Sequence, residues 1–274
     1  MPRTLRLVED PSQDPLERRL DDFGFDRDFT DLLEPLAEWF YRDYWRVEVF
    51  GLENVPAEGR ALLVPNHAGV IPWDGAMIRT AISSEHPNPR PVRMLVADWA
   101  FQLPFVSEFL IKTGNVVAHP QNAATLLERE ELVGVFPEGV KGPAKTYRER
   151  YRVRRFGRGG FIQVAMRTGS PIIPIAVVGS EEVHPVLFEV PLLADLLGLP
   201  AFPVTPTWPL LGLLGAIPLP SKWLIAFGEP IDMAGYGTDA ASDPGLVLEL
   251  SERVRSAVQA RLYELLPLRR TPFS

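Results

Sequence analysis

The sequence predicts an α/β protein with a mostly parallel central sheet flanked by helices, an N-terminal amphipathic helix and a proline-rich apolar insertion. Two observations lead to this prediction. Short apolar runs bounded by glycine or proline alternate with stretches of helical periodicity, as they do in proteins whose parallel strands are joined by helices. The 274 residues, 46% hydrophobic and 23% charged, also have the size and composition to bury such a core. We expect residues 1–28 to form a flexible arm and residues 29–274 a single domain.

The first expected element is an amphipathic helix over residues 29–45. Its large apolar residues recur at helical spacing, at Phe29, Leu32, Leu33, Leu36, Phe40 and Tyr44. Trp39, Tyr41 and Trp45 add aromatic rings to this stripe. One interpretation is a helix packed on the core. The other is an interfacial helix, because tryptophan and tyrosine favour the headgroup level of a bilayer.

Strands and helices then alternate to the C-terminus. The expected strands lie within 46–56, 61–66, 92–98, 114–118, 132–139, 171–180 and 222–231. The expected helices cover about 75–84, 102–112, 122–131, 158–169 and 246–266. Asn122 is a candidate N-cap, and Gly169 a stop signal for the helix before it.

An insertion at 185–220 interrupts this alternation. It is strongly apolar but contains eight prolines, which exclude a long helix or a central strand. We therefore expect short turns and extended pieces. They form either a lid packed on the core or an apolar surface for acyl chains or a bilayer.

Composition excludes several classes of function. A net charge of -7 argues against nucleic acid as a partner. The absence of cysteine excludes disulfides and thiolate nucleophiles. The N-terminus has no signal peptide, and no run of eighteen apolar residues predicts a spanning helix. We expect a cytoplasmic protein that associates peripherally with the membrane.

The strongest chemical motif is PNHAGVIPWDG at 65–75. A buried strand delivers Asn66 and His67 to its C-terminal end, where α/β folds place their sites. Asp74 follows at the start of a helix, and a tight turn can return its carboxylate to the imidazole of His67. Such a pair fixes the histidine tautomer and suits a general base. The alternative is a histidine with only a structural role.

Two further motifs follow the strand at 132–139. Glu138 and Gly139 end this strand, on the same sheet edge as His67; the alternative is an ordinary surface turn. The basic run at 141–159 then includes Lys141, Lys145 and Arg148. It is either a solvated face or an anion site for phosphates of coenzyme A, of a carrier protein's pantetheine arm or of lipid headgroups.

Together these motifs resemble the phospholipid/glycerol acyltransferase family, which includes the lysophosphatidic acid acyltransferases, over about residues 45–235. The family's Asn-His, four residues, Asp motif is similar to Asn66-His67 and Asp74, although six residues intervene here, as in a branch related to neutral-glyceride acyltransferases. Its Phe-Pro-Glu-Gly motif matches 136–139, and its apolar strand with an internal proline matches 172–177. The arginine of its second motif is absent from 114–120, and Val140 replaces a hydroxyl residue.

The resemblance implies transfer of a fatty acyl group from acyl-CoA or acyl carrier protein to a hydroxyl of a lysophospholipid or glyceride at a membrane surface, without a cofactor or metal. His67 would be the base and Asp74 its partner, with backbone amides stabilising the oxyanion. The residues implied to bind substrate are Asn66, Phe136, Pro137, Glu138, Gly139, Lys141, Lys145 and Arg148. The missing arginine argues against a phosphate-bearing acceptor. Two alternatives are a lipid hydrolase, although no Gly-x-Ser-x-Gly motif occurs, and a lipid-binding module without turnover.

Overall fold

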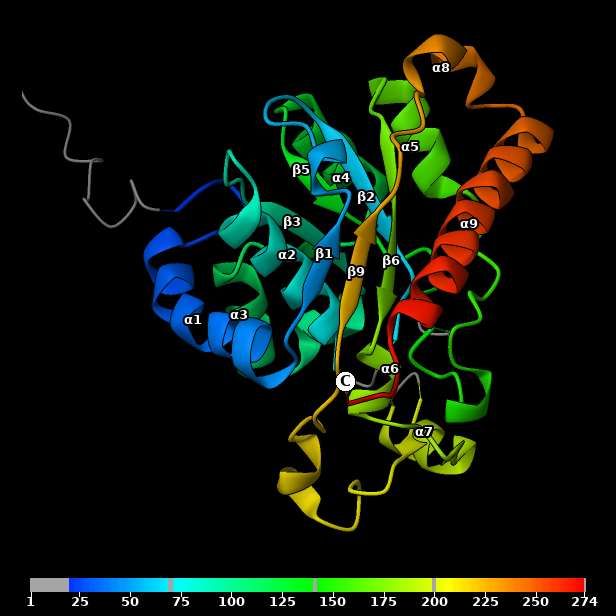
Figure 1. Ribbon diagram of the computed structural model, residues 1–274. Helices are drawn as coiled ribbons and strands as arrows, with labels where there is room; N and C mark the ends of the chain where they lie inside the picture. Colours follow the sequence, from blue (N-terminus) through cyan, green and yellow to red (C-terminus); the bar gives the residue numbers. More distant parts are fainter. Residues whose placement is uncertain (1–19, 69–70, 140–141, 199–200, 274) are drawn as a thin grey trace, which may run out of the picture.

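A seven-stranded sheet forms the centre of the protein (Figure 1). The computed structural model describes residues 20–68, 71–139, 142–198 and 201–273. The strand order is β1-β9-β6-β2-β5-β3-β4. The strands are β1 (Glu48–Phe50), β2 (Ala61–Pro65), β3 (Val92–Val96), β4 (Val116–Val117), β5 (Leu132–Gly134), β6 (Ile172–Val178) and β9 (Leu224–Phe227).

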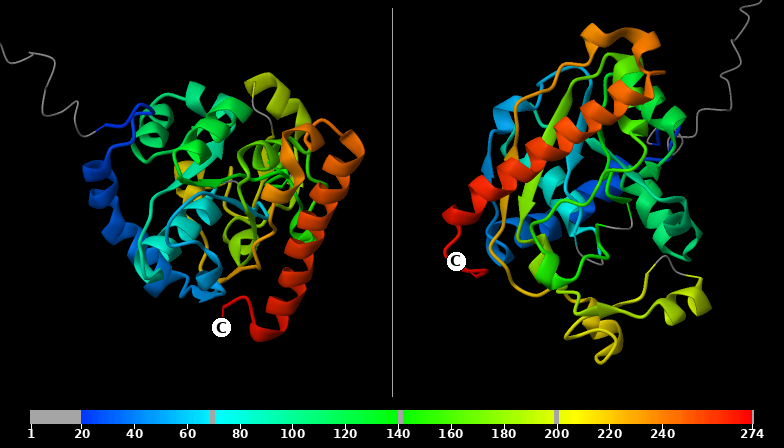
Figure 2. Two further views of the ribbon diagram at one scale, coloured as in Figure 1. Left: turned by 90° about the horizontal axis from the view of Figure 1, so that it is seen from above. Right: turned by 90° about the vertical axis from the view of Figure 1, so that its right-hand side faces the viewer.

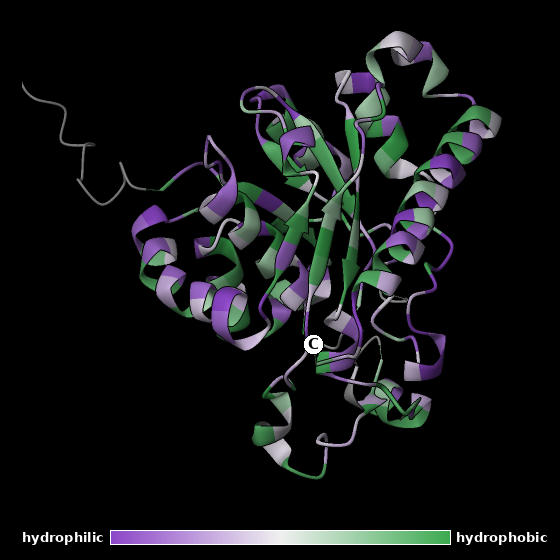
Figure 3. Ribbon diagram, viewed as in Figure 1, coloured by the Kyte–Doolittle hydropathy of each residue, from purple (hydrophilic) through white to green (hydrophobic). Residues whose placement is uncertain are grey.

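The sheet is mostly parallel, as predicted. The pairs β6-β2, β2-β5, β5-β3 and β3-β4 are all parallel, whereas β9 runs antiparallel to β6 and carries β1 parallel to itself. All residues of β2 and β6 are buried, because helices cover both faces of the sheet. Figure 3 shows this as a hydrophobic centre surrounded by helices of mixed polarity.

Nine α-helices and one π-helical turn that extends the first of them lie among the described residues. They are α1 (Arg27–Trp39), α2 (Trp73–Glu85), α3 (Val106–Lys112), α4 (Pro120–Glu128), α5 (Gly160–Thr168), α6 (Ser180–Val183), α7 (Pro191–Leu197), α8 (Gly237–Ala240) and α9 (Pro244–Leu265), with the π-helical turn η2 (Phe40–Tyr44) extending α1. Side chains alternate along the central strands between two cores. Leu62 and Val64 pack with α4, α5 and α9, whereas Ala61 and Leu63 pack with α2 and η2. Figure 2 shows α9 on one side of the sheet and α1 far from it on the other.

Most of the predicted elements are present, with two corrections. The expected N-cap Asn122 is wrong: α4 begins at Pro120, and the side chain of His119 accepts a hydrogen bond from the N–H of Gln121. Proline suits this first position because it has no N–H to leave unpaired. The helix expected over 102–112 is also interrupted near Pro104. The turn η4 (Asp98–Gln102) precedes it and α3 begins after it.

Residues 20–28 of the expected flexible arm contact the rest of the protein. Phe25 is buried, and the carboxylate of Asp21 pairs with the guanidinium of Arg93, which is itself buried and requires a counter-charge. The helix α1 begins at Arg27, where Asp26 caps it through the N–H of Phe29. The rest of the expected arm, residues 1–19, lies outside the described residues.

The insertion projects from one end of the sheet (Figure 1). It contains a two-stranded pair, β7 (Phe188–Glu189) with β8 (Pro203–Val204), as well as α7 and the 3₁₀ turn η7 (Gly212–Ala216). These are the short pieces that the prolines predict. Its leucines do not form a buried lid, since Leu210 is 85% exposed and Leu211 and Leu214 are also exposed. The predicted helix over 29–45 contacts the end of the insertion, where the hydroxyl of Tyr44 donates to the carbonyl of Pro218.

Candidate active site

His67 and Asp74 meet at the C-terminal edge of the sheet. His67 follows the end of β2, and Asp74 lies in the first turn of α2. The imidazole Nδ1 and the carboxylate Oδ2 are 2.8 Å apart. The carboxylate is fully buried, whereas the imidazole retains 14% exposure. Because Nδ1–H donates to Asp74, Nε2 carries the lone pair, and none of the described residues forms a hydrogen bond with it. The imidazole therefore presents a basic nitrogen away from its partner.

The connection between His67 and Asp74 is tied down by the backbone. Asp74 Oδ2 also accepts the N–H of Ala68 at 3.0 Å, and Oδ1 accepts the N–H of Gly75 at 2.8 Å. Its position at the N-terminus of α2 places the carboxylate at the positive end of the helix dipole. These donors satisfy a buried negative charge and hold it beside the imidazole. The residues 69–70 of this turn lie outside the described residues.

Asn66 acts as an extension of β2. Its amide oxygen accepts the N–H of Val177 at 2.7 Å, and its amide nitrogen donates to the carbonyl of Val177 at 3.1 Å. Both groups are buried, so the side chain continues the pairing of β2 with β6 by one residue. This position differs from the expected contact with substrate. Asn66 instead fixes the backbone that enters His67.

Phe136 and Gly142 both pack against His67, the first on its ring and the second on its Cβ and carbonyl. The ring of Phe136 stacks on His67 with centroids 4.1 Å apart. A Cβ built on Gly142 would lie 2.8 Å from His67 Cβ and 2.9 Å from His67 O, closer than real side chains approach. Gly142 was absent from the predicted site. The signal in the sequence that could have found it is this second glycine, three residues after Gly139 in the same loop.

Glu138 lies beneath His67 and is buried. Its Oε1 accepts the backbone N–H of His67 at 2.8 Å, and its Oε2 accepts the N–H of Arg154 at 2.7 Å. The ammonium of Lys145 lies 3.3 Å from Oε2. Both oxygens thus have partners within the protein, whereas the resemblance implied that this side chain binds substrate. In this structure Glu138 supports the backbone of His67.

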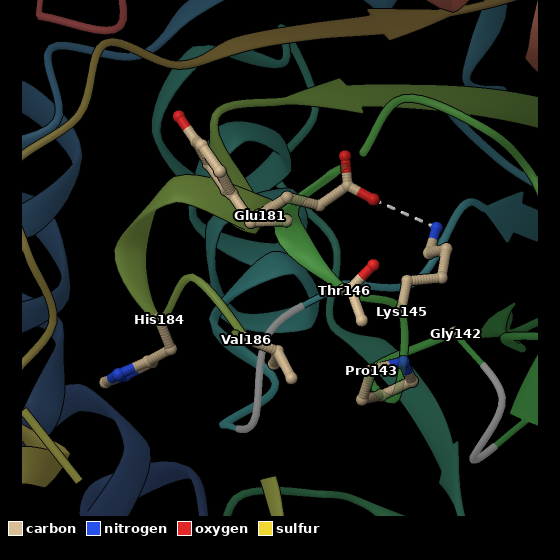
Figure 4. Close-up of a pocket in the computed structure, with 8 residues that line it drawn as sticks. Gly142, Pro143, Lys145, Thr146, Glu181, His184 and Val186 are labelled. Atoms are coloured by element: carbon tan, nitrogen blue, oxygen red, sulfur yellow. Dashed lines mark ion pairs between the residues drawn. The ribbon is translucent and has the colours of Figure 1, made fainter. Parts of the chain in front are cut away.

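The predicted basic residues separate into three cases. Lys145 is buried between Glu138 and Glu181, with its Nζ 3.0 Å from Glu181 Oε1, and Figure 4 shows it pointing at Glu181. Burial lowers the pKa of Lys145, but the carboxylates of Glu181 and Glu138 outweigh it and hold the pKa above its usual value. Lys145 is therefore no open phosphate site. Arg148 is exposed and available to an anion, and Lys141 lies outside the described residues.

Pro137 and Gly139 shape the loop that carries Glu138. The carbonyl of Pro137 accepts the N–H of Gly157 at 3.0 Å, which ties the end of the basic run to this motif. Gly139 has a φ of +55°, a conformation that side chains other than glycine adopt at a cost. No atom would lie within 4 Å of a Cβ at this position, so glycine is needed for the backbone turn and not for space.

The other histidines lie outside this cluster. Both ring nitrogens of His86 bond to backbone carbonyls, His119 caps α4, and His184 is buried. In the parts of the chain that the structure describes, no three histidine or acidic side chains form a group that could hold a metal ion.

Comparison with known proteins gives three kinds of match. A family model described as acyltransferase matches residues 46–178. Uncharacterized proteins of Mycobacterium tuberculosis and Mycobacterium leprae are each 50% identical over 255 residues, covering 93% of this chain and 71% and 70% of theirs. A Bos taurus protein described as a DGAT1/2-independent enzyme synthesizing storage lipids is 28% identical over 78% of this chain and 58% of its own.

A solved structure shares the fold. It is the 1-acyl-sn-glycerophosphate acyltransferase of Thermotoga maritima, which matches with a TM-score of 0.57 and 20% identity. The match covers 95% of this chain and 86% of that one.

Proposed function

Since the chain belongs to the phospholipid/glycerol acyltransferase family and is an acyltransferase, we propose that it transfers a fatty acyl group from a thioester to a glycerolipid hydroxyl, with His67 as the general base. The donor is acyl-CoA or acyl carrier protein, and the acceptor is a lysophospholipid or a glyceride. The observation that carries this proposal is the Nδ1–Oδ2 hydrogen bond of 2.8 Å, with Nε2 left for substrate.

The proposed reaction is a single displacement at the thioester carbonyl. His67 Nε2 takes the proton of the acceptor hydroxyl as its oxygen attacks the carbonyl carbon. The C–S bond of the tetrahedral intermediate then breaks, and the leaving thiolate takes the proton from Nε2. Asp74 keeps Nδ1 protonated and balances the positive charge of the imidazolium. The products are an ester and a free thiol.

Loss of either member of the pair should remove activity without unfolding the protein. We expect His67→Ala to lower kcat/KM by roughly 100- to 10,000-fold, the usual contribution of a positioned base. Asp74→Asn should cost a similar factor, because the amide no longer balances the imidazolium. The assay is acceptor-dependent thiol release from acyl-CoA and from acyl carrier protein. His119→Asn, at an exposed histidine that caps α4, is the control and should retain activity.

The same assay separates the alternative functions. A lipid hydrolase would release thiol without an acceptor, and a binding module would release none. Either result with the wild-type protein would rule out the proposed transfer, as would full activity of folded His67→Ala.

For the acceptor we propose a neutral glyceride over a phosphate monoester. Residues 114–120 lack the arginine that the family places in its second motif. The Bos taurus relative is described as an enzyme of storage lipid synthesis, which favours the same class. In a panel of monoglycerides, diglycerides and lysophospholipids, glycerides should be used at least as well as lysophosphatidic acid. Strict selectivity for lysophosphatidic acid would contradict this proposal.

We also propose that the protein works while docked on a membrane surface. No helix among the described residues is long and apolar enough to cross a bilayer. The insertion carries an apolar rim, which we define as the exposed leucines Leu192, Leu196, Leu210, Leu211 and Leu214. These side chains offer reversible contact with acyl chains, since each contributes about 1.5–3 kcal/mol when removed from water.

A further inference from the structure

We propose that Lys145 is a positioning residue for acyl transfer, which acts through Glu138 on the backbone of His67. This inference rests on the proposed function in one respect, namely that His67 is the base. It assigns to Lys145 no contact with substrate.

A continuous set of contacts joins Lys145 to the base. Glu138 Oε1 accepts the N–H of His67 at 2.8 Å, and Glu138 Oε2 lies 3.3 Å from the ammonium of Lys145. The same ammonium lies 3.0 Å from Glu181 Oε1 on the far side. Glu181 Oε2 in turn accepts the N–H of Tyr151 at 2.5 Å. Lys145 thus bridges two carboxylates from different elements, one in the loop after β5 and one in α6.

The charges in this cluster require the lysine. The side chains of Glu138, Lys145 and Glu181 retain 0%, 3% and 8% exposure, so water screens none of them well. The positive ammonium of Lys145 attracts both negative carboxylates and offsets their mutual repulsion. Without the ammonium both carboxylates keep their N–H donors but lose their shared counter-charge, at a cost that a buried site relieves by moving or by taking up a proton.

Movement of Glu138 would be transmitted directly to the base. The N–H of His67 is hydrogen-bonded to Glu138. The loop that carries Lys145 packs closely on both residues, because a Cβ on Gly142 would lie 3.2 Å from Glu138 Cβ and 2.8 Å from His67 Cβ. These groups therefore pack as one unit. A displacement of about 1 Å in such a unit costs up to about 100-fold in rate even when no substrate contact is lost.

Other charged groups around the cluster are mutually paired or more distant. Glu182 of α6 pairs with Arg269, Tyr151 donates its hydroxyl to Glu182, His184 lines the same small pocket as Lys145 and Glu181, and Arg255 of α9 interacts electrostatically with Glu138. None of them lies within ion-pair distance of both carboxylates among the described residues. Lys145 is thus the group that balances Glu138 and Glu181 together.

The test compares Lys145→Met, Glu181→Gln and the double variant with the wild-type protein. Lys145→Met should lower kcat by roughly 10- to 100-fold with KM within about twofold, since substrate contacts are intact. Its activity relative to wild type should rise as pH falls from 8.5 to 6, because protonation of one carboxylate relieves the repulsion. The double variant removes one carboxylate, so it should recover most of kcat and lose this pH dependence.

Lys222→Met is the matched control. Lys222 also forms an ion pair, with Glu48 at 2.7 Å, two residues before β9, and among the described contacts neither partner bonds to His67, Glu138 or Glu181. It should lose some thermal stability and keep kcat. If Lys145→Met fails to fold, the double variant carries the test, and its kcat must then exceed that of Glu138→Gln.

The outcomes separate this inference from the proposed function. Wild-type kcat in folded Lys145→Met, a change confined to KM, or a double variant no better than the single one would overturn the role of Lys145 while His67→Ala stays inactive. Activity that survives His67→Ala would instead refute the proposed base.

Discussion

At the scale of single residues, the site is held mainly by backbone hydrogen bonds to buried side chains. Asp74 accepts two N–H groups besides the imidazole, Glu138 accepts two, and Asn66 bonds both polar groups of one residue in β6. Each side chain fixes a stretch of chain that enters or leaves His67. The role proposed for His67 as a base therefore depends on the small set of buried side chains that fix its backbone.

A buried histidine gives the fold a predictable response to acid. Burial lowers the pKa of His184 to about 4, from the usual value near 6.5. Between these two values the unfolded chain binds a proton that the folded one does not, so the free energy of unfolding falls as pH decreases from about 6.5 to 4. Above pH 7 the effect is absent. The loss approaches about 3 kcal/mol at the acid end, at about 1.4 kcal/mol per pKa unit.

Urea unfolding from pH 7.5 to 4.5 measures this response. We expect the wild-type protein to lose stability more steeply than His184→Gln, which cannot take up the proton. His119→Gln, at an exposed histidine, should follow the wild type. Equal slopes for wild type and His184→Gln would show that His184 is not buried in its neutral form.

The pair of His67 and Asp74 could be predicted from sequence because it depends on local chain geometry. A strand end and a helix start seven residues apart can bring two side chains together without knowledge of the rest of the fold. The partners of Glu138 and Lys145 could not be predicted in this way. Glu181, which pairs with Lys145, is 43 residues from Glu138 in the sequence, and Arg154, whose N–H bonds to Glu138, is 16 residues from it. Only the tertiary fold brings these groups together.

At the scale of elements, the loop after β5 packs so closely on His67 that it tolerates little added side-chain volume. We expect Gly142→Ala to lower kcat by roughly 10-fold or more and to destabilise the protein by about 1–3 kcal/mol, because its Cβ would meet His67 at 2.8 Å. Steady-state kinetics and thermal unfolding measure the two effects. Gly157→Ala is the control, since its Cβ would lie 3.7 Å from the nearest atom, an ordinary contact. A fully active Gly142→Ala would mean that this loop does not press on His67.

Helix and strand positions were more predictable than their ends. The buried strands follow from their apolar runs, and α5 ends at Gly169, whose left-handed conformation stops a helix. The start of α4 was misplaced because two residue types compete there. Asn122 favours an N-cap, but its amide donates to the carbonyl of Val117, and the preceding proline starts the helix instead.

At the scale of the whole molecule, apolar residues are exposed in separate places. The rim of the insertion is one, and α1 with α3 presents another, in which Phe105 is 90% exposed and Leu32 is also exposed. Contacts from Tyr44 and Trp45 to residues 218 and 219 join the end of η2 to the end of the insertion. The sequence predicted that these segments are apolar. Which residues reach the surface depended on packing.

Membrane docking through the rim predicts a specific loss of binding. Leu210→Glu with Leu214→Glu should weaken sedimentation with phospholipid vesicles by roughly 10-fold or more, since two apolar contacts are replaced by charges. Thiol release from soluble acyl-CoA should stay unchanged. Leu248→Glu, at an exposed leucine of α9, should leave sedimentation as it is in the wild type. Parent-like sedimentation of the folded double variant would exclude the rim as the docking surface.

The shortness of the outermost strands has a consequence for how copies of this protein meet. The sheet ends at β1, with three residues, and at β4, with two, so neither border offers a long row of unpaired peptide groups. A neighbouring chain gains little by hydrogen bonding there, and strand-to-strand polymerisation into fibres is disfavoured. At high protein concentration, association should therefore occur through exposed apolar side chains, and a mild detergent should reverse it.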